Sequence, residues 1–194
     1  NADPRVSGML IISRETLPAH LPPRGIDSHK GDFGSVGILG GAPGMAGAVL
    51  LAARAALYCG AGRVYVGALD ERLAVDPVCP ELMIVTAENL PALPHPACLI
   101  AGPGMGNSNG ARRVLTQTLK VEHALLLDAD ALNLIAGDGE LLVSLQTRKH
   151  ATILTPHPGE AARLLGMSSS EIQSDRTAAI QRLVALTGAT TVLK

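Results

Sequence analysis

The 194-residue chain is 47% hydrophobic and 17% charged, a composition that favours one compact α/β domain and argues against disorder. Its formal net charge is −1 and its basic residues are scattered, so no long-range attraction to a polyanion is expected. Phe33, Tyr58 and Tyr65 are the only aromatic residues. They offer no stacking platform for single-stranded nucleic acid, so we expect no nucleic-acid partner.

Cysteine use and hydropathy indicate the cellular compartment. Cys59, Cys79 and Cys98 lie far apart, without a CxxC pair or a histidine at metal-ligand spacing, which is typical of reduced structural thiols. No apolar stretch reaches the roughly 20 residues that a membrane-spanning helix requires. The first residues also lack the pattern of a signal peptide. We therefore expect a cytoplasmic protein with no membrane partner.

The first segment, residues 1–27, has the composition of a linker. The chain begins with Asn1 rather than Met, and prolines interrupt the stretch repeatedly, as in connecting segments between domains. We expect this stretch to be a linker or the tail of a preceding domain. The folded domain is then expected over residues 28–194.

From Ser35 onward, runs of Val, Ile and Leu alternate with longer segments rich in Ala and Leu. This alternation is typical of repeated βα units around a largely parallel sheet. Strands are predicted near residues 36–39, 63–68, 98–101, 124–127, 151–154 and 190–193. Helices are predicted near residues 46–59, 108–119, 130–136, 140–147, 158–166 and 170–187. The sequence therefore predicts a doubly wound α/β fold with helices on both faces of the sheet.

Unusual residues follow several of the predicted strands. Open parallel sheets bind ligands beyond the carboxyl ends of their strands, so these residues are candidates for a binding site. A glycine-rich run over residues 40–48 follows the first strand, and a second over residues 102–106 follows the third. Asp128 and Asp130 come after the fourth strand, and Thr155, His157 and Glu160 come after the fifth.

The two glycine-rich runs are candidates for close contact with a ligand. The first leads from a strand into a helix, where small residues and free N–H groups suit a phosphate or another polar group. A tight turn that needs glycine for its dihedral angles is the alternative. The first run also resembles a dinucleotide fingerprint with Asp70 as the ribose ligand, but its G-G-x-x-G-x-x-G spacing departs from G-x-G-x-x-G. The second run precedes Asn107, Ser108 and Asn109, any of which can cap the next helix.

The polar residues after the fourth and fifth strands each have an alternative explanation. Asp128 leaves an apolar strand, where a charge is costly unless it meets a metal, a donor or a ligand hydroxyl. Asp130 is open to interpretation as the N-cap of the following helix. His157 stands between two prolines of fixed φ, a rigid position that favours ligand binding over core packing. Glu160 can instead complement the helix dipole.

These segments together resemble the ADP- or ATP-dependent NAD(P)H-hydrate dehydratases, a branch of the ribokinase-like fold. The matching segments are SHKGDFG from Ser28, the glycine run ending at Ala48, AGPGMG from Ala101, DADALN from Asp128, TPHPGEAARLLG from Thr155 and the closing VLK. The resemblance implies a metabolite-repair enzyme, a carbon–oxygen lyase that returns hydrated NADH and NADPH (NADHX and NADPHX) to NAD(P)H. It also implies Mg²⁺ and ADP as co-substrate, with ATP as the less favoured donor.

The resemblance assigns roles to individual residues. It implies a pocket for the hydrated cofactor formed by Gly47, Ala48, Gly104, Gly106 and His157. Lys194 resembles the first residue of the adenine nucleotide loop, and Asp128 and Asn133 resemble positions near the phosphates and the metal. Glu160 resembles a residue of related kinases that positions magnesium-bound water, with His157 replacing their Asn.

The printed sequence departs from the family pattern after VLK. The family continues through a nucleotide loop and an N-x-G-N stretch to a G-x-G-D turn, whose Asp deprotonates the substrate hydroxyl, so the catalytic residue is left unassigned here. Acid–base catalysis contributes about 10²–10⁴ in rate, and we expect little activity and an incomplete sheet from a polypeptide ending at Lys194. The resemblance further implies a homotetramer and, in many bacterial members, a preceding epimerase domain that residues 1–27 would join.

Three other functions remain open from the sequence. A ribokinase-like kinase for a vitamin precursor or sugar would use the same glycine runs, although TPHPGEA departs from its Asn-containing motif. A nicotinamide-dependent oxidoreductase would use the first glycine run and Asp70, but would leave DADALN and TPHPGEA unexplained. A non-catalytic relative that binds nucleotide or cofactor is the third.

Overall fold

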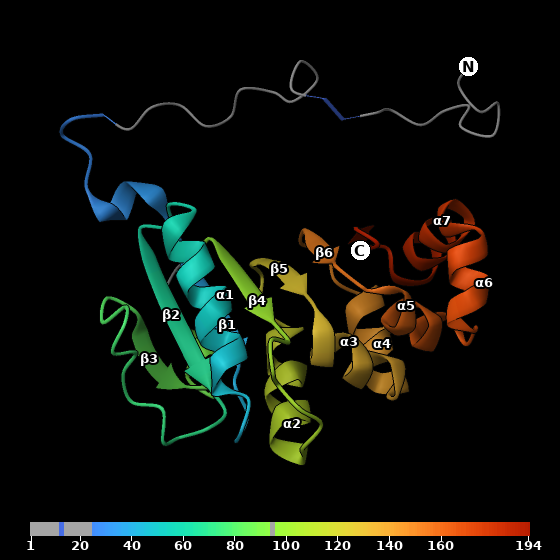
Figure 1. The fold of residues 1–194 in the computed structure, drawn as a ribbon, viewed down its shortest axis with the longest axis horizontal. Helices are drawn as coiled ribbons and strands as arrows, with labels where there is room; N and C mark the ends of the chain where they lie inside the picture. Colours follow the sequence, from blue (N-terminus) through green and yellow to red (C-terminus); the bar gives the residue numbers. More distant parts are fainter. Residues whose placement is uncertain (1–11, 14–24, 94–95) are drawn as a thin grey trace.

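The structure, a computed structural model, describes residues 12–13, 25–93 and 96–194. Its centre is a parallel sheet with the strand order β3-β2-β1-β4-β5-β6-β7, which runs across the molecule in Figure 1. The strands are β1 (Ser35–Gly40), β2 (Arg63–Ala68), β3 (Met83–Thr86), β4 (Cys98–Ala101), β5 (Ala124–Leu127), β6 (Thr152–Leu154) and β7 (Thr190–Thr191). The chain moves outward from β1 to β3 and then returns to the other side of β1, so the predicted doubly wound order is confirmed.

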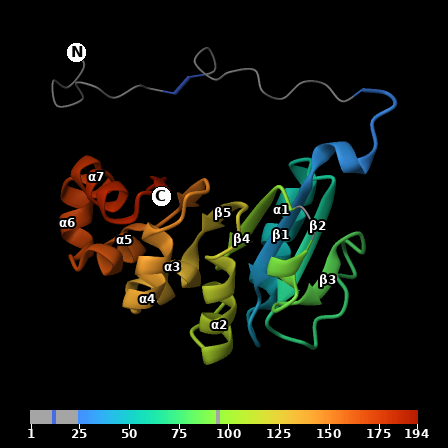
Figure 2. The same ribbon diagram turned by 180° about the vertical axis from the view of Figure 1, so that it is seen from behind.

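The described α-helices are α1 (Ala46–Tyr58), α2 (Asn109–Thr118), α3 (Ala129–Ala136), α4 (Gly139–Gln146), α5 (Pro158–Leu165), α6 (Ser169–Ser174) and α7 (Arg176–Thr187). Helix α1 packs on one face of the sheet, where Val49 and Ala53 lie in one core cluster with Ile38. The helices from α2 to α7 contribute to a second cluster that contains Leu39. Because neighbouring strand residues point to opposite faces, the helices cover both faces, as predicted. The later helices gather at the β6 side of the sheet in both views (Figures 1 and 2).

The pairing register aligns the carboxyl ends of the strands. Leu39 of β1 pairs with Ala101 of β4, which pairs with Leu127 of β5. Leu127 pairs with Leu154 of β6, and Leu154 pairs with Thr191 of β7. The residues that follow β1, β4, β5, β6 and β7 therefore emerge at one edge, which we call the carboxyl edge.

The prediction differs from the structure at three elements. The sequence interpretation missed β3, whose partly exposed residues form an edge of the sheet. The single helix predicted over residues 170–187 is wrong, because the chain leaves helical geometry at Asp175 (φ −146°, ψ 82°) and separates α6 from α7. The strand predicted over residues 190–193 is shorter, since β7 ends at Thr191. Most of the predicted linker over residues 1–27 lies outside the described residues.

None of the helices in the described ranges combines the length and apolarity needed to cross a bilayer. The longest of them, α1, has 13 residues.

Candidate functional site at the carboxyl edge

The two glycine-rich runs lie against each other, because β1 and β4 are neighbours in the sheet. The backbone N–H of Gly41 donates to the Pro103 carbonyl over 3.0 Å, and that of Ala42 donates to the Gly104 carbonyl over 2.7 Å. A Cβ atom built on Gly104 would lie 3.0 Å from the Cβ of Ala48. The residues predicted from each run thus form one joined structure, which we call the glycine-loop pair (residues 40–48 and 102–106).

Some of these glycines are required by the fold itself. A Cβ atom on Gly40 would lie 2.0 Å from the Pro103 oxygen, and one on Gly102 would lie 1.7 Å from the Asp128 oxygen. Gly41 and Gly104 have positive φ angles of 63° and 58°, which other residues adopt only with strain. The tight-turn alternative is therefore correct for this part of the site.

Gly47 has no such structural reason. It lies exposed in the first turn of α1, and apart from its chain neighbours and the backbone of the same helix, no heavy atom lies within 4 Å of the position that its Cβ would occupy. Glycine lowers helix stability relative to alanine, and no contact with a neighbouring residue requires glycine at this position. Open space in front of a glycine at a helix N-terminus is the arrangement that lets a ligand approach the backbone.

Helix α1 also begins with its first N–H groups uncapped by a side chain. Helices α1 and α3 have no side-chain cap hydrogen bond, whereas α2, α4, α5, α6 and α7 each have one. Both uncapped helices begin at the carboxyl edge. Their first-turn N–H groups suit an anionic or polar ligand group.

Asp130 holds the second glycine run in place. Its Oδ2 accepts a hydrogen bond from the Gly106 N–H over 2.8 Å, and Gly106 has a φ of 68°. The N-cap interpretation of Asp130 is wrong, because the N-cap of α3 is Asp128. The sequence interpretation thus missed this contact, and only the place of Asp130 within DADALN hinted at it.

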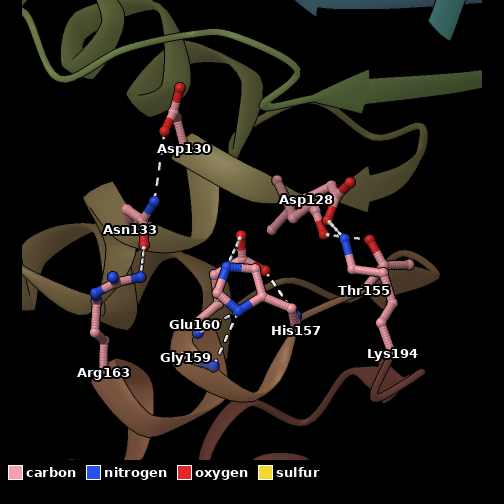
Figure 3. A network of polar contacts seen from close by, with 10 residues as sticks. Asp128, Asp130, Asn133, Thr155, His157, Gly159, Glu160, Arg163 and Lys194 are labelled. Atoms are coloured by element: carbon pink, nitrogen blue, oxygen red, sulfur yellow. Dashed lines mark hydrogen bonds and ion pairs between the residues drawn. The ribbon is translucent and has the colours of Figure 1, made fainter. Parts of the chain in front are cut away.

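Asn133 connects Asp130 to the next helix (Figure 3). Its Nδ2 lies 3.4 Å from Asp130 Oδ1, and its Oδ1 accepts a hydrogen bond from Arg163 Nη1 over 2.8 Å. A cavity of about 410 Å³ lies beside this contact, and its lining residues are Met45, Gly106, Asn107, Asp130, Asn133 and Leu134. The cavity places Asn133 close to the glycine-loop pair.

Asp128 and Lys194 form an ion pair beside Thr155 (Figure 3). Lys194 Nζ donates to Asp128 Oδ1 over 2.6 Å, and the Lys194 N–H donates to the Pro156 carbonyl over 2.9 Å. Ala129, which follows Asp128, is the only non-glycine residue in the described ranges with a positive φ, 48°. Such strained positions cluster at functional sites.

His157 and Glu160 cap α5 reciprocally. His157 Nδ1 accepts hydrogen bonds from the N–H groups of Gly159 (2.9 Å) and Glu160 (3.3 Å). Glu160 Oε2 accepts from the His157 N–H over 2.8 Å, and its Oε1 lies 3.2 Å from His157 Nε2. This network assigns the ring proton to Nε2. The imidazole is half exposed, while only 4% of the Glu160 side chain is exposed.

The structure shows no ready-made metal centre in the part of the chain that it describes, since no group of three or more His, Cys, Asp or Glu side chains there is placed to hold a metal. Mg²⁺ commonly binds through one or two carboxylates together with substrate phosphates and water. The two oxygens of Glu160 face His157, and Asp128 faces Lys194. Both carboxylates are therefore engaged by side chains of this chain.

Asp70, the candidate ribose ligand of the oxidoreductase alternative, is already paired. Its two carboxylate oxygens accept hydrogen bonds of 2.8 Å each from Arg72 Nε and Nη2. These hydrogen bonds lower the pKa of Asp70 below its ordinary value. The Asp70 carboxylate is therefore already engaged by a neighbouring side chain, which a ribose hydroxyl would have to displace or share.

Residues 36–194 match a family model described as NAD(P)H-hydrate dehydratase. The chain belongs to this family. It is 44% identical over 183 residues to the ADP-dependent (S)-NAD(P)H-hydrate dehydratase of Neisseria meningitidis serogroup B, with 92% of this chain and 61% of that protein covered. It is 41% identical over 187 residues to the bifunctional NAD(P)H-hydrate repair enzyme Nnr of Escherichia coli K12, with 94% and 35% covered.

Solved structures support the same family and fold. The ADP/ATP-dependent NAD(P)H-hydrate dehydratase of Bacillus subtilis, co-crystallised with ATP/Mg²⁺, matches with a TM-score of 0.73 at 28% identity, over 90% of this chain and 62% of that chain. A ribokinase-like superfamily protein from Enterococcus faecalis V583 matches with a TM-score of 0.72 at 27% identity, over 89% and 61%. The ribokinase-like fold is thus confirmed, and this chain spans less than two thirds of each of these four relatives.

Proposed function

We propose that the protein serves in the nucleotide-dependent repair of hydrated NADH and NADPH, with ADP as the favoured phosphoryl donor. The observation that carries the proposal is the joined glycine-loop pair at the carboxyl edge, which includes the uncapped N-terminus of α1. The names of the Neisseria and Bacillus relatives supply the substrate class, and the Neisseria name supports ADP as the donor while the Bacillus name includes both ADP and ATP.

The proposed chemistry converts a poor leaving group into a good one. Hydroxide leaves the nicotinamide ring badly, so ADP first transfers its terminal phosphoryl group to the ring hydroxyl, which releases AMP and the hydroxyl proton. Phosphate then leaves with help from the lone pair of the ring nitrogen, and the adjacent ring carbon loses a proton to restore the double bond. One difficult step is thus divided into easier ones. When bound, Mg²⁺ supplies charge neutralisation at the transferring phosphoryl group.

The proposed roles of the individual residues follow their positions at the edge. Gly47, Ala48, Gly104 and Gly106 offer backbone to the hydrated cofactor, and His157 offers a half-exposed imidazole with a fixed tautomer. Lys194 receives the nucleotide phosphates, near Asp128 and Asn133. Glu160 would act on a metal only through water, because both of its carboxylate oxygens face His157.

The test is an assay with hydrated NADPH, ADP and Mg²⁺ that follows both binding and the return of NADPH absorbance. For a polypeptide ending at Lys194, binding of the hydrate with little recovery of NADPH is the expected result, and recovery is expected from a chain that also carries the G-x-G-D turn. Binding of hydrate and ADP by that longer chain without recovery would favour a non-catalytic relative. Phosphorylation of a sugar or vitamin precursor without hydrate binding would favour a kinase, and would overturn the proposal.

Three wider features are proposed from the resemblance. We infer a homotetramer, which light scattering at several concentrations would test. We also infer a cytoplasmic location, which suits the free cysteines at positions 59, 79 and 98 and which cell fractionation would test. Finally, we infer that residues 1–27 join an epimerase domain, in line with the bifunctional E. coli relative; the reading frame upstream of Asn1 would test this.

A further inference from the structure

We propose that Asp130 is a positioning residue that sets the shape of the cofactor pocket through the Gly106 N–H. The inference deepens the proposed function and rests on it for the identity of the ligand. Its structural part, the control of the second glycine run by Asp130, stands on contacts within this chain alone.

The contact between Asp130 and Gly106 joins the segments that follow the paired strands β4 and β5. Gly106 has a left-handed φ of 68°, and its N–H donates to the carboxylate over 2.8 Å. A hydrogen bond from an N–H to an ionised carboxylate is stronger than one to a neutral acceptor. Asp130 thus stabilises the left-handed turn at the end of the second glycine run.

The second oxygen of Asp130 is committed as well. Asn133 Nδ2 lies 3.4 Å from Oδ1, and Asn133 Oδ1 accepts from Arg163 over 2.8 Å. Asn133 therefore presents its amide nitrogen to Asp130 and its oxygen to Arg163. The chain Arg163–Asn133–Asp130–Gly106, which we call the Asp130 relay, is visible in Figure 3 up to Asp130.

The relay connects both parts of the proposed pocket. Arg163 belongs to α5, the helix that begins after His157. At the other end, Gly104 and Pro103 accept the N–H groups of Ala42 and Gly41, so the second glycine run holds the first. Displacement of Gly106 is therefore transmitted to the run that carries Gly47.

A pocket beside the relay is the part of the site that the Asp130–Gly106 contact would shape. It is an open pocket of about 410 Å³ between Met45, the second glycine run and α3. Asp130 lines this cavity, yet its oxygens are directed to Gly106 and Asn133. The geometry assigns Asp130 to shaping the wall of the cavity and not to holding a metal.

The experiment compares Asp130→Ala and Asp130→Asn with a matched control, Asp175→Ala. Asp175 also accepts one backbone N–H, that of Ala178 over 2.9 Å, but it lies at the start of α7. Amide hydrogen exchange of residues 102–109 and the affinity for hydrated NADPH are measured in each variant. Melting temperature identifies any variant that does not fold.

We expect exchange of residues 102–109 to rise at least about tenfold in Asp130→Ala, because the Gly106 N–H loses its acceptor. The Kd for hydrated NADPH should rise about tenfold while the Kd for ADP changes less than about twofold. Asp130→Asn should show smaller effects, since its amide oxygen can accept the same N–H. Asp175→Ala should change neither exchange nor affinity at this site.

Two results would overturn the inference. Unchanged exchange of residues 102–109 in a folded Asp130→Ala would show that Asp130 does not hold the turn. Equal losses of hydrate and ADP affinity would show a general structural role. Failure of the unsubstituted protein to bind hydrated NADPH would instead count against the proposed function, and the exchange data would still decide the role of Asp130.

Discussion

At the residue scale, the glycines of the carboxyl edge divide into two kinds. Gly40 and Gly102 are required because a Cβ atom would collide with a backbone oxygen. Gly47 has neither a neighbouring atom within 4 Å nor a positive φ. The sequence shows both kinds as the same letter, so the distinction between a folding requirement and a ligand requirement comes from the structure.

Gly47→Leu should weaken binding of hydrated NADPH at least about tenfold without lowering stability. The leucine side chain would fill the space before the first turn of α1, while a helix gains up to about 1 kcal/mol when glycine is replaced by a better helix former. Calorimetric titration and thermal unfolding would check this pair of effects. Gly139→Leu is the matched control, because Gly139 also lies exposed in a first helical turn with no atom within 4 Å. Normal binding by Gly47→Leu would remove the ligand role of this glycine.

At the element scale, one ion pair connects α1 to the segment between β2 and β3. Arg54 Nε and Nη2 donate to Asp76 over 2.7 Å each, and Asp76 is fully buried. Asp76 also accepts the Val78 N–H over 3.0 Å. Arg54 is the only charged residue of α1, so its position on the helix is explained by this pair.

The Arg54–Asp76 pair should make stability depend on acid pH. Hydrogen bonding to Arg54 is the main cause that lowers the pKa of Asp76 to about 2. Because the folded value lies below the unfolded value of about 4, the stabilisation is complete above about pH 4. It is lost as the pH falls toward 2. Melting temperature measured across this range should fall steeply.

Arg54→Met tests the same pair at neutral pH. It leaves the Asp76 carboxylate buried without its partner, so the melting temperature should drop by about 10 °C. The acid dependence should also become shallower. Arg63→Met is a suitable control because Arg63 is exposed. An unchanged melting temperature in Arg54→Met would show that the pair contributes nothing to stability.

A second set of side-chain hydrogen bonds lies at the edge of the sheet opposite the carboxyl edge. Arg148 donates to the carbonyls of Leu119, Val121 and His123 over 2.7–2.8 Å and to Thr152 Oγ1 over 3.0 Å. One side chain thus donates hydrogen bonds to three backbone carbonyls of the segment between α2 and β5. Arg148 is partly buried, and this burial lowers its pKa below the ordinary value.

Arg148→Met should lower the free energy of unfolding by about 2–4 kcal/mol, because several carbonyls lose their donor at once. Denaturant unfolding would measure the change. Lys149→Met, at the exposed neighbouring position, should stay within about 0.5 kcal/mol of the unsubstituted protein. If Arg148→Met lowered the free energy of unfolding no more than Lys149→Met does, water would be replacing the guanidinium as the donor to these carbonyls.

The sequence predicts elements well where the residue pattern is strong. β1, β2, β4, β5 and β6 carry apolar runs that are buried in the sheet, and each was predicted within one or two residues. β3 is an edge strand with partly exposed residues, so its pattern is weak. The separation of α6 from α7 depends on the backbone at Asp175, whose side chain caps Ala178, and helical spacing continues through it.

At the scale of the whole molecule, the carboxyl edge presents two neighbouring groups of candidate residues. The first is the glycine-loop pair with the Asp130 relay, which runs from Gly106 through α3 to Arg163 of α5, the helix that His157 caps. The second is the ion pair of Lys194 and Asp128, which follow β7 and β5. The sequence predicted that these residues share an edge because parallel strands end together. It did not predict the contacts, since Asp130 and Gly106 are 24 residues apart and Lys194 and Asp128 are 66 apart.

The first group should bind hydrated NADPH and the second ADP, each with little effect on the other ligand's affinity. Lys194→Met removes the positive charge that would lie beside the ADP phosphates, so the Kd for ADP should rise about tenfold. The Kd for hydrated NADPH should change little. Combined with Asp130→Ala, the changes in binding free energy should add within about 0.5 kcal/mol. Lys120→Met, an exposed lysine on the opposite edge, is the control. Strong coupling between the two substitutions would indicate that Asp130 and Lys194 act on the same ligand.

The pairing of β1 with β4 also has a consequence for biosynthesis. Val36 pairs with Cys98, so one side of β1 stays unpaired until the ribosome has synthesised the chain as far as β4. The unit from β1 to β3 is local in sequence and can form early, with an open hydrogen-bonding edge that waits for β4. Long-range parallel pairing is slow and leaves strands open to association with other chains. Growth temperature during expression should therefore influence the yield of this protein more than substitutions in its later helices.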